Sequence, residues 1–208
     1  QTDKPDTQYT MAQYADDAAA LLDAIDWQQV LVIGVSFGGM VAQELALRHP
    51  DRISRMVLAC TSPGGEGGAS YPLHEVQNMD PVARAKKMIP ISDTRNNAEW
   101  AEANKEAYDA MVTFAATDLY KDEPGRAAGA KRQLEARRHH DTWDRLPKIA
   151  CPSLICGGRF DGIALPATQE KLVDRIPGAK LAMFDGGHLF MLQDRSAIQT
   201  MIDFLKEE

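Results

Sequence analysis

The stretch Gly34-Val35-Ser36-Phe37-Gly38 decides the fold, because it has the pattern G-x-S-x-G and a further glycine follows it. The residues just before it, 30–33, form a short apolar run with three β-branched members among their neighbours, which predicts a strand buried on both faces. The residues after it, 37–48, have the pattern of a helix that ends before a proline. The motif therefore stands where a strand turns sharply into a helix, which is the setting of a nucleophile elbow.

Ser36 is the candidate nucleophile of this turn. The turn holds the serine backbone in a strained conformation, and we expect glycine at positions 34 and 38 because side chains there would collide with the neighbouring strand and helix. The N-terminus of the following helix favours a negative charge that develops beside Ser36. The alternative is a glycine-rich turn in which the serine is incidental.

Two later loops carry a candidate acid and a candidate base. A serine hydroxyl needs a base, and the base needs an acid that orients it. When a G-x-S-x-G elbow is used, the chain order is Ser, acid, His. Asp161 follows a predicted strand at 153–156, and His188 follows a predicted strand at 180–184. Both lie at the carboxyl ends of strands, where parallel sheets place their sites.

The other candidates for these roles have simpler explanations. Asp185 lies on the same short loop as His188, so it is poorly placed to orient that ring and we expect a solvated carboxylate. His49 ends a helix and is interpreted as a cation at its C-terminus. His139 and His140 stand beside two arginines and are predicted on a solvated helix face. His74 is isolated and has no assigned role.

The remaining segments predict an α/β fold with a parallel sheet and a helical insertion. Residues 1–63 and 149–208 form the core, and residues 64–148 form a loop plus a helical cap. The predicted helices are 10–25 with a capping box at its start, 37–48, 81–88, 98–120, 126–139, 165–176 and 196–205, and the predicted strands are 30–33, 56–60, 153–156 and 180–184.

Composition narrows the class of protein. The chain has 208 residues, of which 44% are hydrophobic and 25% charged, and its net charge is −7. It has no apolar run near the ~18 residues that a membrane span needs, and its acidity argues against nucleic acid or an anionic membrane as the partner. Cys60, Cys151 and Cys156 form no C-x-x-C pair, so we expect buried thiols in a reducing cytoplasm. Nothing in the sequence indicates a metal or an organic cofactor.

Three blocks of sequence, 34–53, 157–166 and 176–190, together resemble the α/β-hydrolase superfamily, in particular its small esterases and enol-lactonase-like members. The resemblance implies that Ser36 attacks an acyl carbon of a small-molecule ester or lactone, that His188 takes the proton and that Asp161 holds the imidazole. It also implies that the backbone N–H of Phe37 meets the oxyanion, and that water activated by His188 then releases the acid.

The same resemblance implies that four strands are absent before the elbow, together with the loop that supplies a second oxyanion donor. The loss of one oxyanion donor lowers transition-state stabilisation by about 3 kcal/mol. The strand from Val30 to Ile33 would then be an exposed apolar sheet edge. Three explanations stay open. The chain is part of a longer protein, or the edge pairs with a second chain in a homodimer or other complex, or the truncated domain is stable without these strands.

The expected function is a serine hydrolase of carboxylic esters or lactones, located in the cytoplasm. One alternative is an α/β-hydrolase-fold binding or interaction module, impaired by the missing donor. Another is C–C hydrolysis, peptidase or perhydrolase activity on the same triad. Phe37 and Leu189 are pocket candidates by position. Met111 and Phe114 are weaker candidates, because their helical spacing is also that of ordinary packing.

Overall fold

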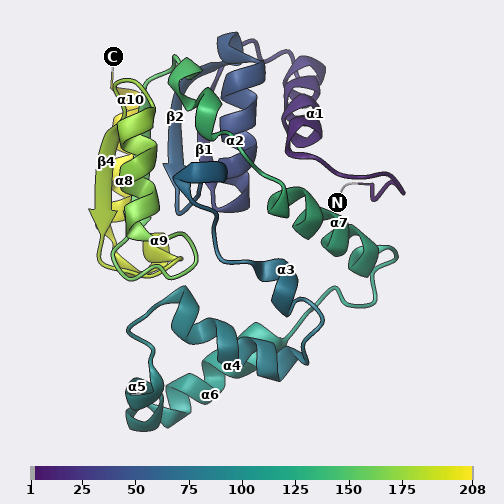
Figure 1. Cartoon of the computed structure of the whole chain (residues 1–208), viewed down its shortest axis with the longest axis vertical. Helices are drawn as coiled ribbons and strands as arrows, with labels where there is room; N and C mark the ends of the chain where they lie inside the picture. The colour runs from purple at the N-terminus through teal and green to yellow at the C-terminus, as the bar shows by residue number, and fades with distance from the viewer. Residues whose placement is uncertain (1–2, 208) are drawn as a thin grey trace.

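The computed structural model describes residues 3–207, and a sheet of four strands lies at its centre. The strands are β1 (Val30–Val35), β2 (Ile53–Ala59), β3 (Ser153–Gly158) and β4 (Lys180–Phe184). They pair in the order β1-β2-β3-β4, and each pair is parallel. The predicted α/β fold with a parallel sheet is therefore confirmed (Figure 1).

Helices cover both faces of this sheet. One face packs against α1 (Met11–Ala24), α2 (Phe37–Arg48) and α8 (Pro166–Arg175). The other face packs against α9 (Phe190–Gln193) and α10 (Ser196–Lys206). Side chains alternate between the faces along each strand, so Met56 of β2 enters the first layer and Val57 enters the second, and both are fully buried.

β1 is an edge strand in the described part of the chain. Its side chains Leu31, Ile33 and Val35 are 51%, 45% and 40% exposed. The prediction that this strand is buried on both faces is therefore wrong for the described residues, whereas the expected apolar edge is present. These three side chains share a face with Val57, and α10 packs on that face over β2 without covering β1. Apolar edges of this kind favour association with other strands.

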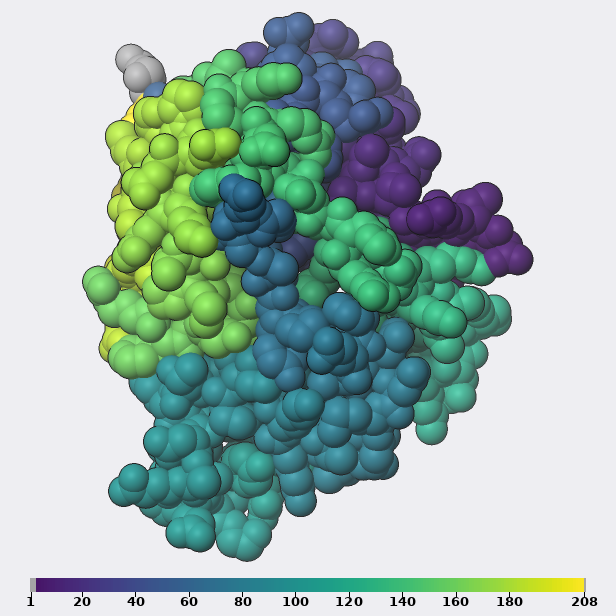
Figure 2. Space-filling view, viewed as in Figure 1, coloured from purple at the N-terminus to yellow at the C-terminus, as the bar shows by residue number. Residues whose placement is uncertain are grey.

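The insertion between β2 and β3 is helical. Its helices are α3 (Leu73–Val76), α4 (Pro81–Ser92), α5 (Ala98–Ala103), α6 (Lys105–Ala116) and α7 (Arg126–Arg138). The single helix predicted over 98–120 is two helices, because Asn104 (φ −126°, ψ 44°) leaves the helical conformation between them. Figure 2 shows α4 to α6 gathered at one end of the molecule, beyond the sheet. No helix among residues 3–207 combines the length and the apolar character required to cross a membrane.

Candidate active site

Ser36 stands in the turn between β1 and α2 with a strained backbone. Its φ of 51° and ψ of −111° are unusual for a residue with a side chain, and such conformations cost roughly 1–3 kcal/mol. The surroundings hold the turn in place. The Ser36 N–H donates to the Ala59 carbonyl at 2.8 Å, and the Thr61 hydroxyl donates to the Ser36 carbonyl at 2.8 Å. β2 and the residues after it thus support the elbow.

The elbow has room only for glycine at two positions, 34 and 39, and the second of these was not predicted from the sequence. A Cβ at Gly34 would lie 2.7 Å from the Gly38 carbonyl oxygen, so the predicted collision at 34 is present. A Cβ at Gly38 would meet nothing within 4 Å among the described residues, so the predicted collision at 38 is wrong. A Cβ at Gly39 would instead lie 2.6 Å from the Cβ of Thr61. The turn therefore packs against Thr61, just after β2, through Gly39 rather than Gly38.

The structure brings Ser36, His188 and Asp161 together from three separate loops. The His188 Nε2 lies 2.9 Å from the Ser36 Oγ, and the His188 Nδ1 lies 2.9 Å from the Asp161 Oδ2. The two distances place a single imidazole between a hydroxyl and a carboxylate. Such an arrangement can move a proton from serine to histidine while the carboxylate holds the ring.

Asp161 is fixed by its own backbone surroundings. It is 1% exposed, and its Oδ1 accepts hydrogen bonds from the N–H groups of Ile163 at 2.7 Å and Ala164 at 2.9 Å. The other carboxylate oxygen is left for His188. Since a buried carboxylate is stable only when its oxygens are paired, these contacts hold both oxygens of Asp161 in place beside the imidazole.

The competing acid and the other histidines lie elsewhere. The side chain of Asp185 is 71% exposed, and Arg95 lies 3.5 Å from it. His49 ends α2, and its Nε2 lies within hydrogen-bond distance, 2.8 Å, of the Asp16 carboxylate on α1. His139 is exposed, as predicted, but His140 is 6% exposed, and its predicted solvated position is wrong.

The reason for the burial of His140 is tertiary. α7 ends at Arg138, and the chain then turns inward rather than continuing as an exposed helix. The Thr142 N–H donates to the Pro63 carbonyl at 2.8 Å, and the Thr142 hydroxyl donates to Gln43 at 2.6 Å. These bonds tie the segment after α7 to the segment that follows β2 and to α2.

The end of α4 holds both of the loops that carry the acid and the base. The Ser92 carbonyl accepts the His188 N–H at 2.6 Å, and the Ile91 carbonyl accepts the Gly162 N–H at 2.9 Å. Asp93, directly after α4, contacts the base loop through Gln193. The Gln193 side chain donates to the Asp93 carboxylate at 2.9 Å and accepts the Gly187 N–H at 2.7 Å. Sequence reasoning did not identify these residues, because no motif links the end of a cap helix to loops about 70 or more residues away along the chain.

Gly158 makes the closest approach between the acid and base loops, and it supplies a first test. A Cβ there would lie 2.2 Å from the Gly187 carbonyl oxygen. We expect Gly158→Ala to lower the free energy of unfolding by about 1–3 kcal/mol. Because the displaced loop carries His188, we also expect turnover to fall roughly 10²-fold. Urea unfolding and ester hydrolysis measure the two effects.

Gly129→Ala is the matched control for this change. Gly129 lies in α7, and a Cβ there would be 3.5 Å from the nearest atom, an ordinary contact. Alanine in a helix is favoured over glycine by up to about 1 kcal/mol, so this variant should be unchanged or more stable. Equal stability losses in the two variants would contradict the steric argument.

The pocket candidates have different surroundings. The Phe37 ring packs edge-on against Tyr14, with the ring centres 5.2 Å apart. Leu189, next to the base, is 52% exposed. Met111 packs inside the insertion beside Ile89 and Val112, and Phe114 is 86% exposed on α6. The position of Met111 is that of ordinary helix packing, and Phe114 faces solvent.

Other groups near the site do not compete with Ser36. Burial, together with the charge of Asp161, raises the pKa of the Cys60 thiol to about 12, so this thiol stays protonated. No group of His, Cys, Asp or Glu side chains within residues 3–207 is arranged to hold a metal ion.

The Phe37 N–H belongs to the first turn of α2, whose donors have no acceptor inside the helix. It is available to an oxyanion beside Ser36.

Known proteins resemble this chain over nearly its whole length. A family model described as the alpha/beta hydrolase fold matches residues 1–194. A poly(3-hydroxyalkanoate) depolymerase from Ectopseudomonas oleovorans is 30% identical over 96% of this chain and 69% of its own length. A 2-hydroxymuconate semialdehyde hydrolase from Pseudomonas putida is 41% identical over 97% of this chain and 71% of its own length. The crystal structure of the enol-lactonase from Burkholderia xenovorans LB400 superimposes with a TM-score of 0.77 at 26% identity, over 99% of this chain and 76% of that one.

Proposed function

The chain belongs to the alpha/beta-hydrolase fold family, and from that premise we propose that it is a serine hydrolase that cleaves carboxylic esters or lactones through an acyl-enzyme. The observation that carries the proposal is the position of the His188 ring, 2.9 Å from the Ser36 hydroxyl on one side and 2.9 Å from the Asp161 carboxylate on the other. This relay of nucleophile, base and acid is the one that serine hydrolases use to cleave acyl compounds.

The mechanism begins with attack on the acyl carbon. The Ser36 Oγ forms a bond to that carbon while His188 Nε2 takes its proton, and the electron pair of the carbonyl moves to the oxygen. His188 then passes the proton to the leaving alcohol as the tetrahedral intermediate collapses to the acyl-enzyme. In the second half, a water gives its proton to His188, attacks the acyl carbon and releases the acid, and Ser36 regains its proton.

The protein lowers the barrier at two places. Asp161 holds the ring with its Nδ1 proton toward the carboxylate and stabilises the imidazolium that forms. The Phe37 N–H, at the start of α2, donates to the oxyanion, where the helix dipole also favours negative charge. Phe37 and Leu189 flank the nucleophile and the base, so we propose that they border the substrate.

The relatives support the reaction class and leave the substrate open. The depolymerase and the enol-lactonase are hydrolases of esters and lactones by their names, which favours the proposal. The 41% identity to a 2-hydroxymuconate semialdehyde hydrolase favours a second candidate, hydrolysis of a related semialdehyde on the same triad. Peptidase and perhydrolase activities have no observation in their favour beyond the triad itself.

A labelling experiment and a substrate panel test the proposal. We expect a fluorophosphonate probe to modify the native protein at Ser36, read by peptide mapping, and to leave the heat-unfolded protein unmodified. The panel compares activated esters, a lactone and a 2-hydroxymuconate semialdehyde. Turnover of the semialdehyde alone would favour the second candidate. An unlabelled Ser36 with no turnover of any member would contradict the proposal and favour a binding module on this fold.

A further inference from the structure

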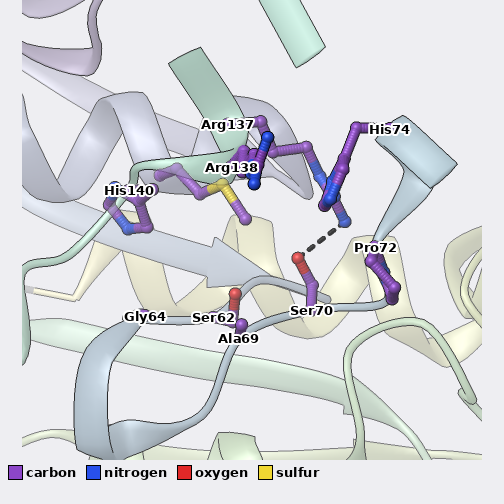
Figure 3. Close-up of a pocket in the computed structure, with 10 residues that line it drawn as sticks. Ser62, Gly64, Ala69, Ser70, Pro72, His74, Arg137, Arg138 and His140 are labelled. Carbon is purple, nitrogen blue, oxygen red and sulfur yellow. Dashed lines mark hydrogen bonds between the residues drawn. The ribbon is translucent and has the colours of Figure 1, made fainter. Parts of the chain in front are cut away.

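The helical cap meets the core at more than one polar contact. One is a small cavity between α7 and the segment after β2, and Figure 3 shows Arg137 and His140 among the side chains that line it. Within residues 3–207, none of its lining residues forms a hydrogen bond with Asp161 or His188. The end of α4 is another contact, and it binds the loops of the acid and the base directly. The end of α4 is therefore a part of the cap that can influence the triad.

The backbone just before the base is held by hydrogen bonds on every side. In the peptide between Gly187 and His188, the N–H donates to the Ser92 carbonyl at 2.6 Å and the carbonyl accepts the Phe190 N–H at 3.1 Å. The N–H of Gly187 itself donates to the Gln193 Oε1 at 2.7 Å. The first of these bonds leads to the end of α4 directly, and the last one depends on how the Gln193 amide is turned.

Asp93 decides how this amide is turned. It is 4% exposed, and its Oδ2 accepts a hydrogen bond from the Gln193 Nε2 at 2.9 Å. Burial raises the pKa of Asp93, but hydrogen bonds from Arg95 and Gln193 lower it further, so the pKa lies below its ordinary value and the carboxylate is ionised at neutral pH. An ionised carboxylate only accepts hydrogen bonds. Gln193 must therefore turn its NH₂ toward Asp93, which leaves its oxygen for the Gly187 N–H.

The residues after Asp93 bind the acid loop as well. The Thr94 N–H donates to the Phe160 carbonyl at 2.9 Å, and the Arg95 guanidinium lies over the Phe160 ring, 4.5 Å from its centre. On the side of the base loop, a Cβ at Gly187 would lie 2.6 Å from the Cβ of Asp93. Asp93 is thus packed between the two loops, where close-packed atoms transmit a displacement to their neighbours.

We propose that Asp93 is a positioning residue for His188. Its carboxylate fixes the Gln193 amide, and that amide holds the loop that carries the base. The distance of 2.9 Å between the His188 Nε2 and the Ser36 Oγ therefore depends on a side chain of the cap. The inference rests on the proposed function, because the place of the ring affects turnover only where His188 is the base.

Asp93→Asn tests this role with almost no change of shape. The Oδ1 of Asp93 accepts both the backbone N–H and the Nε of Arg95 at 3.0 Å, so the amide oxygen stays there and its NH₂ faces the Gln193 Nε2. Turning the Gln193 amide only moves the conflict between two donors to the Gly187 N–H. We expect kcat for para-nitrophenyl acetate to fall about 10-fold with KM within about twofold of the wild type. The loss stays below the ~100-fold of a 1 Å displacement, because Gln193 is exposed and water replaces part of the contact.

The double variant Asp93→Asn/Gln193→Glu restores the order of donors and acceptors. The NH₂ placed at position 93 then donates to one carboxylate oxygen at position 193, and the other oxygen accepts the Gly187 N–H. We expect kcat to return to within about threefold of the wild type. Gln193→Glu alone sets two carboxylates against each other and should lower kcat about 10-fold as well. A double variant as slow as the product of the two single losses would contradict the orienting role.

Asp80→Ala is the control for a general weakening of the cap helix. Asp80 caps the other end of α4, where its carboxylate accepts the N–H groups of Val82 and Ala83 at 3.0 Å each. The loss of this cap should lower the thermal midpoint by about 2–4 °C. Turnover should stay within about twofold of the wild type, because this end of α4 makes no contact with the triad loops among the described hydrogen bonds. Equal losses of kcat in Asp80→Ala and Asp93→Asn would overturn the inference.

The NMR ring resonances of His188 separate this inference from the proposed function, because they need no turnover. They should shift in Asp93→Asn and return toward the wild-type positions in the double variant. If the wild-type protein hydrolyses no ester but the resonances follow this pattern, the proposed function fails and the positioning of His188 by Asp93 stands. If Asp93→Asn does not fold, Gln193→Met, which removes both hydrogen bonds of the exposed amide, should give the same shift and the same loss of kcat. Unchanged resonances together with an unchanged kcat would overturn the inference.

Discussion

Replacing Ser36 by alanine is expected to lower kcat for an activated ester by about 10⁴- to 10⁶-fold. The change removes the attacking oxygen, which lies 2.9 Å from His188 Nε2, and leaves the Phe37 N–H in place. The fold should survive, because alanine and serine bear the same strain at a φ of 51° and the backbone bonds to Ala59 and Thr61 remain. Steady-state hydrolysis and fluorophosphonate labelling both measure the loss.

Ser54→Ala is the control for this variant. Ser54 lies at the opposite end of β2, where its hydroxyl donates to the Val30 carbonyl at 3.1 Å. We expect near-normal turnover and at most a modest loss of stability, about 1 kcal/mol, from the missing hydrogen bond. If Ser36→Ala retained turnover within about tenfold of the wild type, an acyl-enzyme on Ser36 would be excluded.

Asp161→Asn should lower kcat by about 10⁴-fold, the loss that the equivalent change produces in serine proteases. The remaining oxygen of the amide can still accept from Ile163 and Ala164, so its NH₂ group faces His188. An NH₂ donates, which forces the Nδ1 of His188 to accept and moves the ring proton to Nε2. That nitrogen then cannot take the proton of Ser36. Ester turnover and the ring resonances of His188 in an NMR spectrum report the two parts of the effect.

Asp185→Asn tests the competing acid on the base loop. Its carboxylate is 71% exposed and contacts only Arg95 among the ion pairs of the described residues. Turnover should therefore stay within about twofold of the wild type, as for most exposed changes away from the chemistry. If Asp185→Asn lost ester turnover while Asp161→Asn kept the wild-type rate, Asp185 rather than Asp161 would be the acid that orients His188.

The sequence predicted the core of the fold because its signals are local. The helix 37–48 has the predicted bounds, and the strand 180–184 does too. The predicted capping box at the first helix is half formed: the Gln13 N–H donates to the Thr10 hydroxyl at 3.0 Å, but the Gln13 side chain donates to Asp17. A terminal backbone bond depends on adjacent residues, whereas the reach of a long side chain depends on competing partners.

The errors fall where distant segments meet. The sequence placed His140 on a solvated helix, since its neighbours are charged, but the chain turns into the molecule where Thr142 binds Pro63. It assigned the second steric demand of the elbow, besides that at Gly34, to Gly38, but Thr61, two residues after β2, leaves no room for a side chain at Gly39 instead. In both places the deciding contact comes from a residue that is remote along the chain.

The sequence by itself determined the strand-turn-helix around Ser36, the parallel order of the sheet and the identity of the acid and base candidates. These follow from short-range periodicity, from glycine in a tight turn and from the chain order of three loops. Only the tertiary structure decided how α4 holds the His188 loop, that β1 has an exposed apolar face, and that Arg137 and His140 share one cavity. Burial and unpaired charge are properties of the space between segments, and local sequence patterns do not specify which segments enclose it.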